Sequence, residues 1–368
     1  MLRRWCALAA FLYMAAPARG EEALSEPYAG LSSDVRSESA GLNERAATPK
    51  ARRPVVRIIS WNVQAFGGNI QPEREAAFDE ILGQMLSETR TARILSFQEI
   101  ANGTGAAKIA GTLPGGGERW SGSFTNTDSA MDNGFFTERQ VGKDCERPLF
   151  AAQDEGGRWR RDREKMMHPP HAAHLRVGDF DFTLVSVHLT FGGADRSGTA
   201  RELGTLLDWV AQYLAKPGAD PDVIITGDFN MPTRAGRTDE RGSTVEDVLT
   251  AHPAFGKAPS GAGQPMPSWG LVPMVDSPTS RSKGKPVHNY DHFIMTGDAY
   301  NEEYAAGSAG GVPAEFIGAV EQRRGVQVSD HLPISAGFYT SGLGNDGRPI
   351  APDGDSACRA LLSMAPLK

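Results

Sequence analysis

The stretch Ile224-Ile225-Thr226-Gly227-Asp228-Phe229-Asn230-Met231-Pro232 combines an apolar run of strand type with two polar side chains at its end. Side chains two residues apart leave an extended backbone on the same face. Asp228 and Asn230 are therefore expected to point together beyond the strand, while Phe229 turns back toward the core. Burying two polar groups there is costly unless a metal or a substrate satisfies them. Turn formation is the competing explanation, because Asp and Asn are also common where a strand enters a turn.

Five further segments of similar construction favour a site over a turn. In each of them an apolar or β-branched run adjoins a residue that can bind a metal or transfer a proton. Any one of them is consistent with a structural role, but six such strand boundaries in one chain indicate catalysis. The residues at the five further boundaries are Asn62, Glu99, His188, Asp291 and the adjacent pair Asp330 and His331.

Two stretches between these boundaries have helical periodicity. Apolar residues recur at i, i+3, i+4 and i+7 from Phe78 to Met85 and again from Leu203 to Val210. Short strands mixed with helices predict a layered α/β sandwich, with two sheets packed face to face and helices outside. The segments 101–144 and 253–288 are interpreted as long connections that shape a substrate groove.

The motifs Trp61-Asn62, Gln98-Glu99, Gly227-Asp228-Phe229-Asn230 and Ser329-Asp330-His331 together resemble those of the endonuclease/exonuclease/phosphatase superfamily. The resemblance extends over about residues 55–338. This superfamily includes pancreatic-type deoxyribonuclease, exonuclease III-like repair enzymes, neutral sphingomyelinases and inositol-polyphosphate phosphatases. The resemblance implies an α/β protein with a four-layer α/β sandwich, in which two packed mixed β-sheets are flanked by helices.

The same resemblance implies roles for the matching positions. Glu99 is expected to be the principal metal ligand, with Asn62 and Asp330 near the ion. Asp228 and Asn230 are expected to orient the nucleophile and to hold the phosphoryl group.

Two histidines complete the expected catalytic residues. His331 is expected to pair with Asp291, and His188 is expected to be the other catalytic histidine. In deoxyribonuclease-like members a glutamate at a strand start partners the first histidine. Glu146 is the best match for that role in this chain, and Glu138 is a rival.

The expected cofactor is Mg²⁺, with Mn²⁺ or Ca²⁺ as alternatives, because carboxylate oxygens suit hard cations that assist phosphodiester hydrolysis. The chain has no Cys-x-x-Cys and no His-Glu-x-x-His motif, so the sequence gives no reason to expect zinc. His168, His171 and His174 cluster around a proline pair that no helix would accommodate. They are predicted to be surface or strand-edge histidines.

The chain is predicted to begin with a cleaved signal peptide, residues 1–20, in which Arg3 and Arg4 precede an apolar run too short to span a membrane. A flexible leader (21–54), a catalytic domain (55–339) and a C-terminal tail (340–368) are expected to follow. The protein is therefore expected to be secreted or periplasmic, without a stable membrane anchor, and monomeric.

Loss of Cys6 with the signal peptide leaves Cys145 and Cys358, in a compartment where disulfides persist. We predict that these two cysteines form a disulfide. Two unpaired thiols are the alternative.

The net charge of −7 becomes −10 when the three arginines of the signal peptide are removed, so the protein as a whole does not attract a polyanion. Basic residues nevertheless lie close to the motifs in the sequence. Arg281, Lys283 and Lys285 are predicted to contact substrate phosphates. Further basic runs with the same expected role contain Arg234, Arg237, Arg241, Arg323, Arg324, Arg158, Arg160, Arg161, Arg163 and Lys165.

The sequence therefore predicts a Mg²⁺-dependent phosphodiesterase, a deoxyribonuclease-like endonuclease that cleaves nucleic acid, foremost DNA, with little sequence preference. One alternative is a lipid phosphodiesterase or phosphatase of the same superfamily, for which the segment 266–272 offers an apolar loop. The other alternative is a non-catalytic binding protein on the same fold.

Overall fold

The computed structural model describes residues 54–87, 91–129, 131–192, 196–236, 242–255, 269–272, 278–341 and 355–364. The predicted signal peptide, nearly all of the predicted leader and residues 266–268 of the apolar segment 266–272 lie outside these residues.

One six-stranded sheet, within the described residues, has the order β15-β16-β1-β2-β4-β3. Its central strands β1 and β2 run parallel, whereas β1 and β16 pair in antiparallel fashion. The strands are β1 (Val55–Gly67), β2 (Ala92–Ala101), β3 (Trp120–Phe124), β4 (Asp132–Glu138), β15 (Gly310–Gly311) and β16 (Ile334–Tyr339).

A second six-stranded sheet of the described chain has the order β11-β14-β10-β9-β8-β5. Its strands β9 and β10 are parallel, and β14 is antiparallel to β10, so both sheets are mixed. The strands are β5 (Gly142–Pro148), β8 (His171–Val177), β9 (Phe180–His188), β10 (Val223–Asp228), β11 (Trp269–Val272) and β14 (Asp291–Thr296). Two hairpins, β6 (Ala151–Gln153) with β7 (Trp159–Arg161) and β12 (Ser280–Ser282) with β13 (Lys285–His288), form small separate sheets.

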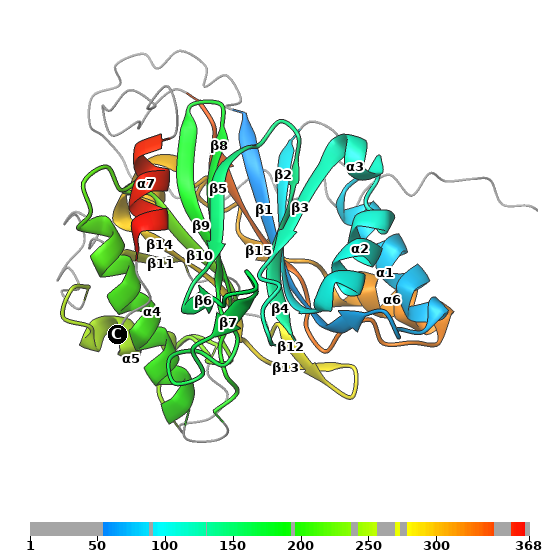
Figure 1. Cartoon of the computed structure of the whole chain (residues 1–368). Helices are drawn as coiled ribbons and strands as arrows, with labels where there is room; N and C mark the ends of the chain where they lie inside the picture. The colour runs from blue at the N-terminus through cyan, green and yellow to red at the C-terminus, as the bar shows by residue number, and fades with distance from the viewer. Residues whose placement is uncertain are drawn as a thin grey trace, which may run out of the picture. The chain divides into compact units, whose positions relative to one another are not determined.

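The two large sheets pack face to face, and a buried apolar cluster fills the space between them. Ile58 of β1 and Phe338 of β16 belong to this cluster together with Phe182 of β9 and Ile224 of β10. Helices cover the two outer faces, which gives the predicted four-layer sandwich (Figure 1). The prediction of fold class is confirmed.

The outer helices bury the apolar stripes that the sequence predicts. Phe78 and Ile81 of α1 pack on the outer face of the first sheet, and Leu203 and Val210 of α4 pack on that of the second. The first sheet carries α1 (Pro72–Met85), α2 (Asn102–Thr112) and α6 (Ala314–Arg324), with the short α3 (Gly116–Arg119) nearby, and the second carries α4 (Ser197–Leu214), α5 (Val245–Ala251) and α7 (Asp355–Ser363) (Figure 1). A π-helical turn, η2 (Ala299–Glu303), follows β14.

The interpretation of 101–144 as a long connection is wrong. This segment contains α2, α3, β3 and β4, and the last two strands extend the first sheet. Their apolar residues are few and are interrupted by glycine and serine, so the local pattern alone does not indicate strands. Within 253–288 the described residues form β11, β12 and β13.

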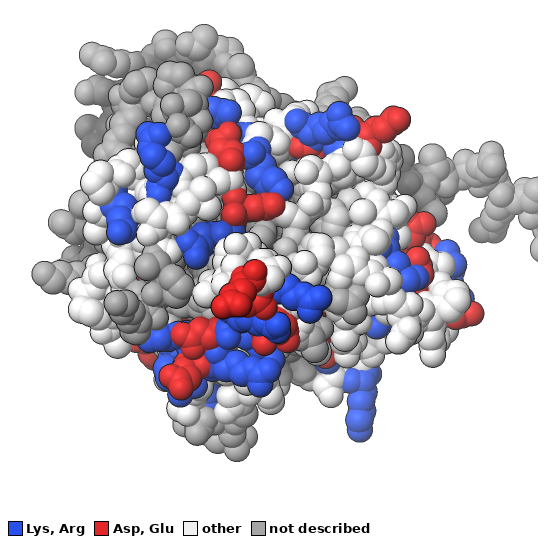
Figure 2. Space-filling view, in the orientation of Figure 1, with Lys and Arg blue, Asp and Glu red and all other residues white. Residues whose placement is uncertain are grey.

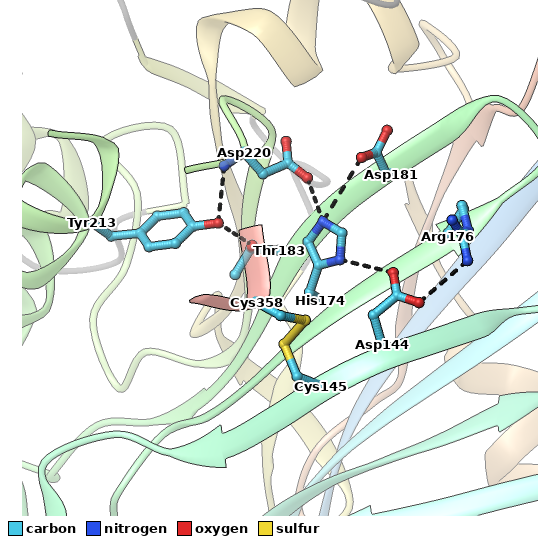
Figure 3. Close-up of a disulfide and its surroundings, with 9 residues drawn as sticks. All are labelled: Asp144, Cys145, His174, Arg176, Asp181, Thr183, Tyr213, Asp220 and Cys358. Carbon is cyan, nitrogen blue, oxygen red and sulfur yellow. Dashed lines mark hydrogen bonds and ion pairs between the residues drawn. A yellow bond between two sulfur atoms is a disulfide. The ribbon is translucent and has the colours of Figure 1, made fainter. Parts of the chain in front are cut away.

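The predicted disulfide is present between Cys145 of β5 and Cys358 of α7, with the two Cα atoms 5.8 Å apart. It joins the helix Asp355–Ser363 of the predicted tail to the edge strand of the second sheet (Figure 3).

Candidate active site

Three neighbouring strands of the second sheet place their polar ends side by side. Asp228, the last residue of β10, pairs in register with His188 at the end of β9 and with Asp291 at the start of β14. Phe229 is fully buried, as predicted, and Asn230 lies beside Asp228, whose Oδ1 accepts the Asn230 backbone N–H at 2.8 Å. The strand register therefore assembles three of the predicted catalytic side chains.

Asn62 and Glu99 lie within strands of the first sheet rather than at their ends. The β1–β2 pairing is regular up to Asn62 and resumes at Phe66, and Gln64 and Ala65 in between have positive φ. Glu99 also has a positive φ, of 60°. Irregularities of this kind bend a strand and redirect its side chains, and they are frequent next to active sites.

The segment that carries Asp330 and His331 is fixed against β1. Ser329 Oγ donates to the Asn62 carbonyl at 2.6 Å, and the His331 N–H donates to Ser329 Oγ. Trp61 Nε1 donates to the His331 carbonyl at 3.1 Å. These hydrogen bonds join residues that are 267 and 270 positions apart in the sequence, and they hold the two segments together at the site.

Asn62 connects the two sheets at the site. Its Nδ2 donates to Glu99 Oε1 and to Asp228 Oδ2, each at 2.9 Å, while its Oδ1 accepts the Gln64 N–H. Glu99 Oε2 in turn accepts the Ala65 N–H. The amide nitrogen of Asn62 therefore holds both Glu99, the predicted metal ligand, and Asp228, the carboxylate predicted to orient the nucleophile.

His331 forms the predicted pair with Asp291 through a 2.8 Å contact at Nδ1, and its Nε2 lies 3.4 Å from Asp228 Oδ2. Burial opposes the imidazolium, but the charges of Asp291 and Asp228 outweigh it and raise the pKa of His331 to about 10. Burial, assisted by the charge of Asp291, raises the pKa of Asp228 to about 7, although His331 opposes this shift. His331 is therefore a cation at neutral pH.

His188 also reaches the site, with Nε2 3.7 Å from Glu99 Oε1 and 3.8 Å from Asp228 Oδ2. Its ring stacks on that of His168, with centroids 4.5 Å apart. Burial and the charge of His331 lower the pKa of His188 to about 3, and burial and the charge of His188 lower that of His168 to about 4. Both rings are neutral at pH 7.

Neither glutamate proposed as a partner of His188 occupies that position, so this expectation is corrected. Glu146 pairs with Lys143 at 2.9 Å and lies 3.5 Å from His171 Nε2. Glu138 accepts from Arg93 and Arg119 instead. The buried Nδ1 of His188 has no hydrogen-bond partner in the part of the chain that the structure describes. The β5–β8 pairing directs Glu146 toward His171, which the sequence pattern cannot show.

The residues around Glu99 suit a hard divalent cation. The Oδ1 atoms of Asp291 and Asp330 are buried and lack a hydrogen-bond partner among the described residues. Burial raises the pKa of Asp330, and the nearby charge of Glu99 raises it further. Mg²⁺ prefers oxygen donors such as carboxylates, and a bound cation would offset the cost of burying these unsatisfied oxygens, so the residues fit the expected ion.

Most of the basic residues expected to contact phosphates form ion pairs. Arg281 is buried, contacts Glu321 through both terminal nitrogens at 2.7 and 2.8 Å and donates to the Ser329 carbonyl. Its expected role is therefore corrected to a structural one. Arg234 pairs with Asp247, Arg160 with Asp154, and Arg324 with Glu80. Basic and acidic side chains accordingly alternate on the face over β6 and β7 (Figure 2).

Lys283 and Lys285 are exposed on the β12–β13 hairpin. Ser280 at its base forms a β-bridge with His331, so the hairpin starts beside the site. Arg237 and Arg241 lie outside the described residues.

Two residues at the site, His168 and Arg74, were not predicted from the sequence. His168 was predicted to be a surface or strand-edge histidine, but it is partly buried against His188. Arg74 of α1 lies close enough to Asp330 and Glu99 for their charges to raise its pKa, although burial lowers it overall. His171 and His174 are only 2% and 1% exposed, so the same prediction is also wrong for them. No local signal distinguishes these positions, because their partners lie on other strands.

No protein-family model and no curated protein sequence matches the chain. Among solved structures, TDP2 from Caenorhabditis elegans is 13% identical with a TM-score of 0.51, and the match covers 78% of this chain and 77% of that one. D. rerio TDP2 complexed with single strand DNA product is 16% identical with a TM-score of 0.50, covering 78% of this chain and 99% of that one. An endonuclease/exonuclease/phosphatase family protein from Bacteroides thetaiotaomicron is 12% identical, with a TM-score of 0.49, over 79% and 100% of the two chains.

The two TDP2 structures share the architecture described above, and at this level of identity the likeness concerns the fold. The chain shares its fold with these TDP2 structures, and this four-layer sandwich is the fold that its motifs predicted.

Proposed function

We propose that the protein is a divalent-cation-dependent phosphodiesterase. The observation that carries this proposal is the single amide of Asn62, which joins Glu99 to Asp228, the carboxylate that lies against the His331–Asp291 pair. A non-catalytic binding protein has no need to keep a cation-binding carboxylate, a charged histidine and a neutral histidine together in one buried cluster.

Glu99 and Asp330, with Asn62 nearby, would hold the cation, which when bound neutralises charge on the phosphoryl group and stabilises the leaving oxygen. His331, kept protonated by Asp291, would donate from Nε2 to a phosphoryl oxygen. Asp228 would accept a hydrogen bond from the attacking water and orient it. Asn230, whose Nδ2 donates to the Leu189 carbonyl, would fix the position of Asp228 and of the phosphoryl group.

His188 would act as a neutral imidazole in this arrangement. A neutral ring can accept a proton at one nitrogen and donate from the other. Its Nε2 lies near Glu99 and Asp228, so it can contact a phosphoryl oxygen or the water. General acid–base groups of this kind contribute about 10²–10⁴-fold to the rate.

The substrate we propose first is nucleic acid, foremost DNA, cleaved internally with little sequence preference. The exposed Lys283 and Lys285 next to the site support this choice, since lysines contact backbone phosphates without reading sequence. A protein of the same fold, D. rerio TDP2, has been crystallised with single strand DNA product.

A lipid or another apolar phosphodiester is the second candidate, and two exposed apolar side chains favour it. Phe191, three residues after His188, is 67% exposed, and Met167, next to His168, is 41% exposed. The buried Glu202 holds both segments, because its two carboxylate oxygens accept the N–H groups of Met167 and Thr190. An apolar rim of this kind suits an acyl chain, although a nucleobase could also stack on Phe191.

A secreted or periplasmic location is part of the proposal. It rests on the predicted signal peptide and on the Cys145–Cys358 disulfide, which is typical of oxidising compartments. Among the described residues, no helix combines the length and the apolar character needed to cross a membrane. The monomeric state remains a prediction.

Purified mature protein should be assayed on plasmid DNA, RNA and sphingomyelin vesicles, with Mg²⁺ and with EDTA, beside the variant His331→Ala. We expect Mg²⁺-dependent nicking of the plasmid that EDTA and the variant both abolish. Hydrolysis of sphingomyelin but not of nucleic acid would select the second candidate. If wild type and His331→Ala were equally inactive on all three substrates, while the wild type bound one of them, the binding-protein alternative would be preferred.

A further inference from the structure

A second group of polar side chains lies at the other end of β10, away from Asp228. His174 of β8, Asp181 of β9 and Asp220, which precedes β10, turn toward one another there (Figure 3). His174 Nε2 lies 2.9 Å from Asp220 Oδ2 and 3.9 Å from Asp181 Oδ2. One donor atom from each of the three residues falls within 4.8 Å of the other two.

The remaining nitrogen of His174 and the backbone around Asp220 are both fixed. Asp144 Oδ2 lies 3.2 Å from His174 Nδ1, and Arg176 holds the other oxygen of Asp144 at 3.3 Å (Figure 3). Tyr213 Oη accepts the Asp220 N–H. A histidine that binds a metal through one nitrogen usually donates from the other to a carboxylate, which fixes the ring and increases its basicity.

Asp222 provides an observation that is independent of the contacts within this group. Its side chain is only 8% exposed, and its Oδ1 has no hydrogen-bond partner in the described part of the chain. Its backbone N–H donates to Asp220 Oδ1 at 2.8 Å, so Asp222 adjoins this group. An uncompensated buried carboxylate of this kind is strongly unfavourable unless positive charge is close.

We propose that His174, Asp181 and Asp220 bind a divalent transition-metal cation, foremost Zn²⁺, at a site separate from the catalytic centre. Zinc accepts one imidazole nitrogen and two carboxylate oxygens at about 2.0–2.2 Å, so neighbouring tetrahedral ligands lie about 3.4 Å apart. The distances from His174 Nε2 to Asp220 Oδ2 and Asp181 Oδ2, 2.9 and 3.9 Å, bracket this value. A histidine ligand disfavours Ca²⁺ and Mg²⁺, which prefer oxygen donors.

The position of the site indicates a structural role. Its three ligands come from β8, from the start of β9 and from the segment before β10, so a bound ion would fasten three consecutive parts of one sheet. Asp144, which orients His174, adjoins Cys145, whose disulfide attaches α7 (Figure 3). This inference does not depend on the proposed phosphodiesterase activity. The competing explanation is an imidazolium shared between Asp144 and Asp220 without any metal.

The test compares wild type with Asp181→Asn and with Asp179→Asn. Asp181 is the most exposed of the three ligands, so its loss is least harmful to folding, and the exposed Asp179 two residues away is the matched control. Each mature protein is stripped with a chelator and dialysed against Zn²⁺. Bound zinc per chain and the midpoint of thermal unfolding are then measured.

We expect Asp181→Asn to bind one zinc ion fewer per chain than wild type and Asp179→Asn. Zinc should raise the unfolding midpoint through this site in the latter two proteins, so the increase should be smaller in Asp181→Asn. Asp144→Asn should keep the ligands but weaken zinc affinity about 10–100-fold. Equal zinc content and equal stabilisation in wild type, Asp181→Asn and Asp179→Asn would overturn the proposal. Because zinc content is compared between variants outside the catalytic centre, that result would leave the phosphodiesterase proposal intact.

Discussion

The imidazole rings of His168 and His188 stack with their centroids 4.5 Å apart and their planes 9° from parallel. His168 Nδ1 also lies 3.2 Å from Ser129 Oγ, which anchors the first ring to the loop before β4. The stack covers one face of His188 and contributes to the burial that keeps it neutral. His168 therefore acts as a positioning residue for His188.

Replacement of His168 by alanine should expose His188 to water. We expect the pKa of His188, followed by NMR, to rise toward its ordinary value and kcat/KM to fall by about tenfold or more, because a misplaced general acid–base group loses most of its effect. His168→Phe is the matched control, since it retains a stacked ring and should retain more of the activity. An unchanged His188 pKa in His168→Ala would contradict the positioning role.

Glu99→Gln should weaken the binding of the divalent cation. The substitution keeps the size of the side chain but removes the charge that attracts the cation. Its single carbonyl oxygen can still accept from one of the two donors, Asn62 or Ala65. We expect a weaker affinity for Mg²⁺, measured by calorimetry, and a large loss of hydrolysis at limiting Mg²⁺. Glu155→Gln, at an exposed position, should behave as wild type. Hydrolysis at the wild-type rate by Glu99→Gln would exclude Glu99 as the metal ligand.

The stability of the metal-free protein should depend on the ionisation of His331. Its folded-state pKa is raised to about 10, so its stabilising contribution is complete below the unfolded pKa and is lost as the pH rises through about 10. The pKa of Asp228 is raised to about 7, so this group lowers the stability as the pH rises from its unfolded pKa to about 7, below the range tested here. From about pH 7 to about pH 9.5 in EDTA, urea unfolding should show a larger decrease in stability for wild type than for His331→Gln. Parallel curves for the two proteins would argue against a charged His331.

Salt should weaken DNA binding through Lys283 and Lys285. Each phosphate contact contributes about −0.9 to the slope of log affinity against log salt concentration, so replacing both lysines by glutamine should reduce the slope by up to about 2. Lys216→Gln, an exposed change after α4, is the control and should leave the slope unchanged. If the salt slope of the double variant equalled that of wild type, the nucleic acid would not contact Lys283 and Lys285. Weak salt dependence in wild type, with activity that follows vesicle binding, would favour the lipid candidate.

The disulfide should stabilise the protein through the attachment of α7. Its two cysteines are 213 positions apart, and the chain-entropy model gives roughly 5 kcal/mol as an upper limit for so long a loop. We expect Cys145→Ala with Cys358→Ala to lower the free energy of unfolding by roughly 2–5 kcal/mol in denaturant titration. Mass spectrometry of the non-reduced protein should find the linked peptides. Two alkylatable thiols in the mature protein would show that the bond does not form.

The sequence by itself identified the fold class and the residues at the ends of the strands. Asp228 and Asn230 are recognisable because the strand that precedes them has a local apolar pattern and because alternate side chains share a face. Asp291 and His331 carry the same kind of signal and were paired correctly. Such signals are local in the chain, and they do not depend on which other elements the strand packs against.

Only the tertiary structure decided which side chains become partners. Glu146 lies beside His171 because β5 pairs with β8. Arg281 forms an ion pair with Glu321, 40 positions away in the sequence. His168 reaches His188, and His174 reaches Asp220, across segments that are separate in the sequence. The availability of a charge or an imidazole for catalysis or metal binding depends on these neighbours, because burial and opposite charge determine whether it is ionised and accessible. The periodicity of the sequence does not show which residues become these neighbours.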